Sequence, residues 1–587
     1  EDEEEEEDMT QYDTDEEDFE FGKAGKASLI STTIIQKAEG SPNTPKTPVR
    51  QGHPKDQIKE LGPYAHYQNF APIQEERTLK LPREESIKGT IPDYIDNGVY
   101  YVLGPNPSNV HKKQPPLDEE GEKCFLEWRD GDGMLHGFHF ESKAPIRYQN
   151  RFVQTSWLRL EQKEQCQLSD GAHSSIWNVL KYKTRFALGL EEGTIESQSL
   201  HYKKDVANHH ITYFHDKFIA TSANGGELYE LQMPSMGTVS TMPLPSELSS
   251  MELIPHVHID PWNHDLTVFA KQYKSPYLRY AIISKSGKCK FTTDISSLTE
   301  PIHMHDFVLS KSYAISVCAP FEMEVLWKHT VFGGQPKSTF NPHGISKLMV
   351  MTRLPHSESR FIKYIPISSC DVPHFVHAYE QNDGSVVVYG LVVSGESIEQ
   401  TNHKYKGAHG GTDGYMTHQT ELVRWVINLE DESARETSLY PALNYAVINP
   451  RFKTKPLTYV WALTYYDQGL MTSFSETPLY LGVVQFNTET RIANTYKCGR
   501  KKFAYGLTFV PNPNGEKETD GTLMLMVYDD FVQKSEVVLL DAHSMKEVAA
   551  VSLPYRVPFG FHAGFAPFEA IHGQVSKPII KSTLSSS

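Results

Sequence analysis

Histidine is the residue type in this sequence with the widest chemical use. The chain of 587 residues contains 26 histidines, and a neutral imidazole can bind a metal ion or transfer a proton near neutral pH. Four segments place histidines among strand-forming residues, namely PHVHIDP, IHMHDF, PHFVHAYE and VPFGFHAGF. Their histidines are His256 and His258, His303 and His305, His374 and His377, and His562.

The spacing of these histidines does not by itself define a site. In the first two segments the histidines are two residues apart, so each pair shares one face of a strand. Gaps of 49, 69 and 188 residues separate His256, His305, His374 and His562. No H-E-x-x-H pattern links them. A shared metal site is therefore one interpretation, and unrelated core or surface histidines are the other.

The elements that must position these histidines are short β-strands. Turn-forming segments such as GPNP, SKSGK, QNDGS, PNPNG and TDG separate runs rich in β-branched and aromatic residues, and no long helical pattern alternates with them. Many short strands over about 500 residues predict a large closed all-β body such as a propeller. The clearest strand runs are Gly98–Leu103, Leu266–Tyr273, Tyr280–Ser284, Lys347–Leu354, Ser385–Ser394, Leu523–Tyr528 and Glu536–Asp541.

Charge is concentrated at one end of the chain. The 57 basic and 74 acidic residues give a formal net charge of -17, but residues 1–20 hold 14 carboxylates and no Lys or Arg. The other 567 residues carry 60 acidic and 57 basic side chains, a balance of -3. This body has no basic excess to attract phosphates, so we expect no nucleic-acid partner.

We expect three parts along the chain. Residues 1–60 predict a disordered acidic leader of unknown partner, because they cannot bury enough apolar surface to fold. Residues 61–575 form the β body, and residues 576–587 a flexible tail. The six cysteines contain no C-x-x-C pair, which fits a reducing compartment. No apolar run reaches the roughly 18 residues of a membrane span, so we expect a cytoplasmic protein.

One segment favours contact with a membrane surface. Ile176–Leu190 (IWNVLKYKTRFALGL) mixes bulky apolar residues with Lys181, Lys183 and Arg185. A helix or loop packed on the body is one interpretation. Peripheral membrane contact, with the basic side chains at the head groups, is the other.

Several motifs together resemble the carotenoid cleavage oxygenase family, which includes carotenoid, apocarotenoid and stilbene dioxygenases and the retinoid isomerohydrolase. Gly89–Pro107 resembles the family's G-x-Y-x-R-x-G-P-N-P segment, Trp128–Phe140 its W-x-D-G-D-G-M and Arg151–Thr155 its R-x-V-x-T. ANHHITYFHDKFIA is similar to A-N-T-x-x-x-x-H-x-x-x-x-L-A. The histidine segments then resemble A-H-P-x-x-D-P, M-H-D-F, F-H-x-x-N-A-Y-E and G-F-H-G-x-W, in family order. The resemblance covers residues 85 to 570.

The resemblance implies a seven-bladed β-propeller with a cap of helices and loops over an axial iron site. Four histidines would hold Fe(II): His256, His305, His374 and His562. No catalytic residue beyond these ligands is implied, and the neighbours His258, His303 and His377 would not be ligands. His377 replaces a family Asn and could donate or accept a proton. Four neutral imidazoles leave a six-coordinate ion two open positions, enough for O2 and a solvent or substrate atom.

The sequence departs from the family at the outer partners of the ligands. Family members place glutamates where they accept the outer N–H of three ligand histidines, which fixes the orientation of each ring. The matching positions here are Ala223 or Asn224 in IATSANGG, Leu439 in SLYPALN with Glu436 nearby, and Gly506 or Leu507 in YGLTFVP. The chain is therefore either an active enzyme with different outer partners or a weak or inactive apocarotenoid-binding relative. We assign the Asp and Gly residues of DGDG (130–133) to tight turns and give them no chemistry.

The resemblance favours a hydrophobic polyene substrate, cleaved with O2 at one conjugated double bond to two carbonyl products. A stilbene substrate is the alternative, but Ser156 and Trp157 follow Thr155 where stilbene cleavers carry a Lys. A further alternative is iron-assisted ester cleavage of the retinoid isomerohydrolase kind. The basic and apolar segment Ile176–Leu190 favours a substrate taken from a membrane over a stilbene.

Overall fold

The computed structural model describes residues 68–106, 131–164, 169–170, 173–174, 204–215, 217–222, 226–325, 337–354, 361–404, 420–467, 470–471, 479–567 and 570–571. All of them belong to the compact unit Pro54–Ser587. The leader predicted at residues 1–60, the segment Ile176–Leu190 and the tail predicted at residues 576–587 lie outside the described residues. These interpretations, and the boundaries of the body at 61 and 575, stay predictions.

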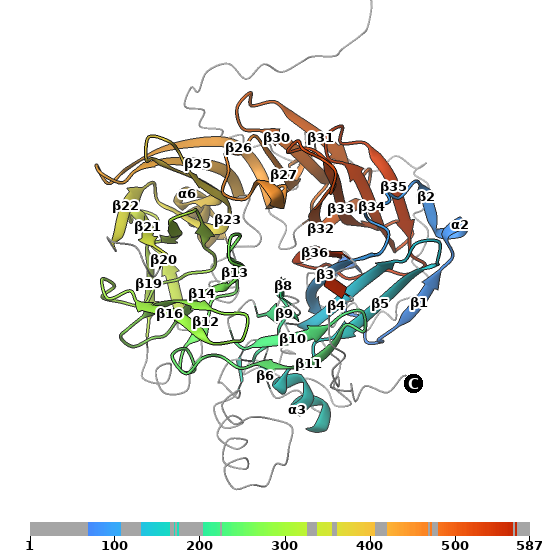
Figure 1. Cartoon of the computed structure of the whole chain (residues 1–587), viewed down its shortest axis with the longest axis horizontal. Helices are drawn as coiled ribbons and strands as arrows, with labels where there is room; N and C mark the ends of the chain where they lie inside the picture. Colours follow the sequence, from blue (N-terminus) through green and yellow to red (C-terminus); the bar gives the residue numbers. More distant parts are fainter. Residues whose placement is uncertain are drawn as a thin grey trace, which may run out of the picture. The chain divides into compact units, whose positions relative to one another are not determined.

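The described chain consists mainly of antiparallel sheets arranged in a ring around a central axis (Figure 1). Five sheets have four or five strands each, and a sixth has seven. The seven-stranded sheet consists of two four-stranded halves that share β26 (Ser433–Val447), whose pairing is interrupted by bulges on both sides. The ring therefore has seven blades, and the predicted seven-bladed β-propeller is confirmed.

The first four blades follow the chain from its N-terminal side. The first contains β1 (Thr78–Leu81), β3 (Gly98–Asn106), β4 (Asp132–Phe140), β5 (Ile146–Phe152) and β36 (His562–Pro567). The second contains β8 (His210–Phe214), β9 (Lys217–Thr221), β10 (Leu228–Gln232) and β11 (Gly237–Met242). The third contains β12 (Glu252–Leu253), β13 (His258–Ile259), β14 (Leu266–Lys271), β15 (Leu278–Ile283) and β16 (Cys289–Asp294). The fourth contains β17 (Val308–Leu309), β18 (Tyr313–Cys318), β21 (Ser346–Thr352) and β22 (Ile362–Ile367).

The remaining three blades complete the ring. The fifth contains β23 (Cys370–Glu380), β24 (Val386–Ser394), β25 (Thr420–Asn428) and β26, and the sixth contains β26, β27 (Tyr459–Thr464), β30 (Gly482–Asn487) and β31 (Ala493–Lys497). The seventh contains β2 (Ile87–Gly89), β32 (Lys502–Pro511), β33 (Gly521–Asp529), β34 (Lys534–Asp541) and β35 (Glu547–Ser552). Short hairpins outside the blades are β6 (Ser169–Asp170) with β7 (His173–Ser174), β19 (Phe321–Glu324) with β20 (Lys337–Phe340), and β28 (Tyr466–Asp467) with β29 (Leu470–Met471).

Strands from the two ends of the described chain pair with each other and close the ring. C-terminal β36 pairs with N-terminal β3, so that His562 lies opposite Leu103, and β2 pairs with β35. Closure of this kind leaves no free edge between the first and last blades. It also brings a histidine from the end of the chain into the first blade.

Apolar side chains fill the spaces between neighbouring blades. Along β24 the side chains of Val386 and Val388 belong to one hydrophobic cluster, and those of Val387 and Tyr389 to another. Because successive strand residues point to opposite faces, the continuous apolar run of β24 packs on both sides. The interblade cores hold the inner strands in fixed positions around the axis.

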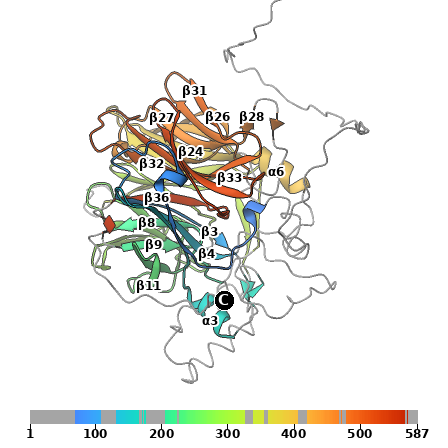
Figure 2. The same cartoon turned by 90° about the vertical axis from the view of Figure 1, so that its right-hand side faces the viewer.

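The two longest helices among the described residues begin at hydroxyl caps. The helix α3 (Ser156–Glu164) follows Thr155, whose Oγ1 accepts the backbone N–H of Leu158 at 3.1 Å. In α6 (Gly395–Lys404), the backbone N–H of Ser397 donates to Ser394 Oγ at 3.2 Å. In Figure 2, α6 and β28 project from one side of the ring. The other short helices are η2 (Gln68–Phe70), α2 (Arg83–Ser86) and η5 (Pro450–Phe452).

None of the helices in the described part of the chain has both the length and the apolar character needed to span a bilayer.

Candidate metal centre

Five histidines from five different blades meet at the axis of the propeller. They are His209 just before β8, His256 between β12 and β13, His305 before β17, His374 on β23 and His562 at the start of β36. Each lies on or next to a strand at the edge of its sheet, and Figure 1 shows β8, β13, β23 and β36 around the centre. We call these five residues the histidine cluster.

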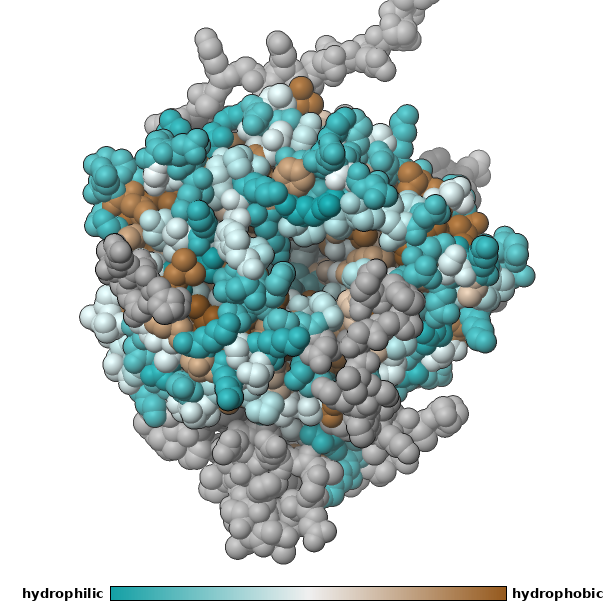
Figure 3. All heavy atoms as spheres, in the orientation of Figure 1, coloured by the Kyte–Doolittle hydropathy of each residue, from teal (hydrophilic) through white to brown (hydrophobic). Residues whose placement is uncertain are grey.

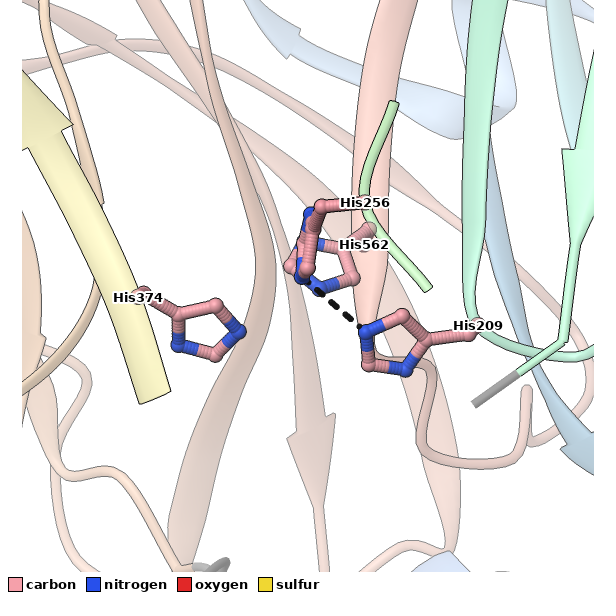
Figure 4. A group of neighbouring side chains, drawn as sticks. All are labelled: His209, His256, His374 and His562. Carbon is pink, nitrogen blue, oxygen red and sulfur yellow. Dashed lines mark hydrogen bonds between the residues drawn. The ribbon is translucent and has the colours of Figure 1, made fainter. Parts of the chain in front are cut away.

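Four members of the histidine cluster present nitrogens close enough to share one ion. One ring nitrogen from each of His209, His256, His374 and His562 lies within 4.8 Å of the others (Figure 4). The Nε2 atoms of His209 and His256 are only 3.1 Å apart. Three of the four ligands predicted from the sequence are therefore in this group.

The predicted ligand His305 lies directly beside this group. Its ring centroid is 4.9 Å from that of His209, 5.1 Å from that of His256 and 5.7 Å from that of His374. The structure thus brings all four predicted positions together at the axis, although His305 is not in the group of nitrogens within 4.8 Å. The assignment of these four residues as ligands stays a prediction.

The sequence-based prediction missed His209. This residue is fully buried, and its ring centroid is also 4.9 Å from that of His562. The signal was present in the motif comparison, because His209 stands where the family segment A-N-T has its threonine. A fifth imidazole at the axis is a feature that the family pattern does not predict.

The DGDG motif positions the segment that ends at His209. The backbone N–H of Gly133 donates to the Val206 carbonyl at 2.7 Å, and a Cβ at Gly133 would lie 2.1 Å from the Ala207 carbonyl oxygen. Ala207 has a φ of 46°, in the left-handed region that L residues rarely adopt. Asn208 Nδ2 donates to the Gly131 carbonyl at 2.8 Å. The motif therefore fixes backbone beside the site.

Burial keeps the histidine cluster neutral. Burial lowers the pKa of each of the five imidazoles below its ordinary value, and for four of them the charges of neighbouring histidines lower the pKa further. For His374, Asp306 and Asn444 act in the opposite direction. Neutral imidazoles are the form that binds metal ions.

Several nitrogens of the histidine cluster are buried without a hydrogen-bond partner among the described residues. They include Nδ1 of His209 and Nε2 of His562. Buried polar atoms are rarely left unpaired, and a bound metal ion would satisfy these nitrogens. The donor set and these unpaired nitrogens fit a metal ion bound by imidazoles.

Asp306 connects the segments that carry two cluster members. Its Oδ2 accepts the backbone N–H of Phe375 at 2.8 Å, and its Oδ1 lies 2.9 Å from Nε2 of His258. Asp306 directly follows His305, and Phe375 directly follows His374. The carboxylate therefore fixes the two segments relative to each other.

The neighbouring histidines of the sequence motifs have other contacts. His258 interacts with Asp306, and the ring of His303 lies 4.7 Å from that of Phe321. Nε2 of His377 donates to the Lys455 carbonyl at 2.7 Å. None of the three belongs to the group of nitrogens within 4.8 Å that the described residues form.

The positions expected to carry outer glutamates are occupied differently. Leu439 packs into the hydrophobic cluster around β24, and nearby Glu436 accepts the indole N–H of Trp425 at 2.9 Å. Gly506 has a φ of 63°, and its carbonyl accepts the Tyr100 hydroxyl at 2.5 Å. A side chain at position 506 would be strained, so no carboxylate can enter there without a change in the backbone of β32. Ala223 and Asn224 lie outside the described residues.

Aromatic rings border the histidine cluster. The ring of Tyr445 lies 5.5 Å from that of His374 and 5.3 Å from that of His562, and the ring of Phe561 lies 5.6 Å from that of His209. Burial raises the pKa of Tyr445, so its hydroxyl stays neutral. Figure 3 shows the molecule from the same side as Figure 1, and the surface seen there is largely hydrophilic with a hollow near its middle.

Comparison with known proteins assigns the family. The family model described as Retinal pigment epithelial membrane protein matches residues 70–567. A carotenoid 9,10(9',10')-cleavage dioxygenase from Crocus sativus is 26% identical over 520 residues, which cover 86% of this chain and 89% of that protein. The apocarotenoid-15,15'-oxygenase of Synechocystis sp. is 23% identical over 498 residues, covering 82% of this chain and 92% of that protein.

Solved structures show the same fold. A variant of the Synechocystis apocarotenoid oxygenase superposes with a TM-score of 0.65 at 19% identity, covering 87% of this chain and 99% of the other. The match of the family model over most of the chain agrees with the order of the sequence motifs. The chain therefore belongs to the family of the retinal pigment epithelial membrane protein and the carotenoid cleavage oxygenases, as a divergent member.

Proposed function

We propose that this protein is a metal-dependent dioxygenase that cleaves a conjugated C=C bond of a carotenoid or apocarotenoid to two carbonyl products. The observation that carries the proposal is the meeting of buried, neutral imidazoles from separate blades at the axis. The names of the relatives support the reaction class, since they are carotenoid and apocarotenoid oxygenases. The family and the neutral imidazoles of the cluster both support a metal centre.

The proposed metal is Fe(II), held by the imidazoles of His256, His305, His374 and His562. Imidazole suits Fe, Zn, Cu and Ni, and an all-neutral donor set leaves the full charge of the ion in place. When bound there, iron would supply the activation of dioxygen. A solved structure of the Synechocystis enzyme is of its cobalt-substituted form, which supports a metal centre in this fold.

The protein's own part is to position the polyene and keep water away. The rings of Tyr445 and Phe561 lie beside the histidine cluster, and aromatic side chains suit contact with a flat conjugated chain. We propose no acid–base residue, because the neutral Tyr445 hydroxyl and the neutral imidazoles would not exchange protons readily at neutral pH. Rate enhancement would come from holding one double bond in place.

The test is product analysis with the purified full-length chain and Fe(II). Substrates would be β-carotene, a set of apocarotenals and resveratrol, incubated under 18O2. We expect labelled aldehyde or ketone products from a polyene, none from His256→Ala, and unchanged products from His343→Ala, which changes an exposed histidine. Products from resveratrol alone would support the stilbene alternative. With a retinyl ester added to the substrates, an unlabelled alcohol from that ester would support iron-assisted ester cleavage.

A second candidate is an apocarotenoid-binding relative with little or no turnover. It is favoured by Leu439 and Gly506, which stand where the family resemblance places carboxylates. Loss of such outer partners typically lowers metal affinity or activity by about 10–100-fold. Apocarotenal binding that is unaffected by iron removal, with no product under 18O2, would select this candidate.

Peripheral membrane contact of a cytoplasmic protein through Ile176–Leu190 belongs to the same proposal. Its support is the mixture of basic and bulky apolar residues in that segment. We expect the chain to co-sediment with anionic lipid vesicles, and a variant with Lys181, Lys183 and Arg185 changed to Gln to bind them less. Equal binding by both proteins would contradict membrane contact at this segment.

A further inference from the structure

We propose that His209 is a fifth imidazole ligand of the metal ion, which leaves the ion one open position in place of two. This inference rests on the metal centre of the proposed function. It concerns a residue that the family pattern fills with threonine. It therefore distinguishes this chain from the relatives whose four-histidine site the sequence resembles.

His209 and His256 lie close enough to bind the same ion. Their Nε2 atoms are 3.1 Å apart. Metal–imidazole bonds of about 2.1 Å that meet at a right angle place their nitrogens about 3.0 Å apart. The separation is therefore the one expected for two neighbouring ligands of a single ion.

Metal binding by His256 would leave both ring nitrogens of His209 without a hydrogen-bond partner among the described residues. If Nε2 of His256 directs its lone pair to the metal, it has neither a proton to donate nor a lone pair to accept one. The Nε2 atom of His209 then loses its partner, and Nδ1 of His209 is already buried without one. Because an unpaired buried polar atom is costly, coordination of the same ion is the favourable arrangement for Nε2 of His209.

His209 lies in the middle of the histidine cluster, and backbone contacts hold its position. Its ring centroid is 4.9 Å from each of the rings of His256, His305 and His562. The backbone N–H of His209 donates to the Thr221 carbonyl at 3.0 Å. The left-handed Ala207 and the close approach of Gly133 set the direction of the chain just before it. These contacts fix the backbone from which the His209 ring extends to the axis.

A fifth imidazole would reduce the number of open coordination positions on the metal ion. Five imidazoles on a six-coordinate ion leave a single open position, so dioxygen and a solvent or substrate atom cannot both bind the ion. The substrate must then be held by protein side chains alone. Aromatic neighbours such as Tyr445 and Phe561 are placed for that role.

The test counts imidazoles around the metal. The full-length chain would be loaded with Co(II) or Fe(II), and X-ray absorption would give the number of imidazole neighbours in the wild type, His209→Ala and His209→Thr. We expect five in the wild type and four in both variants, with stronger visible Co(II) absorption in the variants as the coordination number falls. Metal affinity, measured by competition with a chelator, should fall at least about tenfold, the lower limit for loss of an outer partner.

His139→Ala is the matched control, because His139 is a buried histidine outside the histidine cluster. It should leave the spectra unchanged. His209→Thr restores the residue of the family motif and tests the proposal if His209→Ala does not fold. Four imidazoles in the wild type, with spectra unaffected by either change at His209, would overturn the fifth ligand and leave the proposed function intact. Failure of the wild type to bind metal would overturn both.

Discussion

Two buried polar groups in this propeller differ in how fully they are paired. Around Lys204, the ammonium group lies 2.9 Å from Asp132 Oδ1 and 2.8 Å from Glu161 Oε2, and all three side chains are at most 3% exposed. In the histidine cluster, by contrast, several buried nitrogens have no partner among the described residues. The charges of the first group form ion pairs within the protein, whereas the second group has nitrogens close enough to bind a metal ion.

The pKa shifts express the same difference. Burial alone would lower the pKa of Lys204, but the charges of Asp132 and Glu161 outweigh it and raise the pKa. In the histidine cluster burial and the neighbouring histidines both lower the pKa, as at His562. Removing the Lys204 ammonium would leave two carboxylates buried without their cation, whereas burial of the histidine cluster keeps its imidazoles in the neutral form that binds metal ions.

The largest effect should come from removing a proposed ligand. His374→Ala should reduce the iron content to background and product formation below detection. In His374→Ala, removal of a buried polar ring raises the free energy of unfolding, and the cavity that remains lowers it. The metal-free variant should therefore lose less stability than a variant of the Lys204 group. Iron analysis, chromatography and urea unfolding check these outcomes. An iron-replete, active His374→Ala protein would remove His374 from the site.

Breaking the paired group should cost stability. Lys204→Met leaves two carboxylates buried without their cation, and we expect a loss of about 3–5 kcal/mol in the free energy of unfolding. The matched control is Lys88→Met, which removes an exposed lysine 3.5 Å from Glu547 and should change stability by about 0–1 kcal/mol. Equal urea midpoints for the two variants would contradict the difference between the groups.

Asp306 shares a feature with each group. Its carboxylate oxygens have partners, as in the Lys204 group, and it directly follows His305 of the histidine cluster. Asp306→Asn removes one acceptor from the contacts with His258 and the Phe375 N–H. We expect metal affinity, measured by chelator competition, to fall by about 10–100-fold. Glu380→Gln is the control, since Glu380 accepts bonds from Ser310 and Ser312 away from the site. Equal affinity in both variants would show that Asp306 does not position ligands.

The smallest predicted effect is on pH dependence. Burial, with a further contribution from Arg147, lowers the pKa of His139 to about 3, whereas an unfolded histidine titrates near 6.5. Between these values the unfolded chain binds a proton that the folded chain does not. Stability therefore falls as the pH drops below about 6.5, by about 1.4 kcal/mol per pH unit for this residue.

Urea unfolding of His139→Gln between pH 7 and pH 5 checks this prediction. The slope of stability against pH should be smaller than in the wild type by the contribution of one histidine. His343→Gln, at an exposed position, should keep the wild-type slope. A His139→Gln slope equal to the wild type would mean that His139 binds its proton over the same pH range in the folded and the unfolded chain.

Much of the fold followed from the sequence, because the strand runs and turn segments are local features. The β24 run at Ser385–Ser394 predicted its strand directly. The meeting of the histidines did not follow from spacing, since His562 reaches the axis only through pairing of β36 with β3 at the other end of the chain. The order of the family motifs supplied what the spacing could not.

His209 shows the limit of motif comparison. Its position depends on the left-handed Ala207 and on the close approach of Gly133, and neither is visible in the sequence. A motif assigns roles only to positions where the family has a role, so a histidine in place of threonine was passed over. The same limit applies to Gly506, whose contact with Tyr100 appears only in the folded chain.

Anaerobic titration of the metal-free chain with Fe(II) tests most directly whether the histidine cluster is a metal centre. Retained iron would be measured after desalting, for the wild type and His256→Ala. We expect one iron per chain in the wild type and background iron in the variant. A wild-type chain that retains no iron, or a variant that retains as much as the wild type, would contradict the claim.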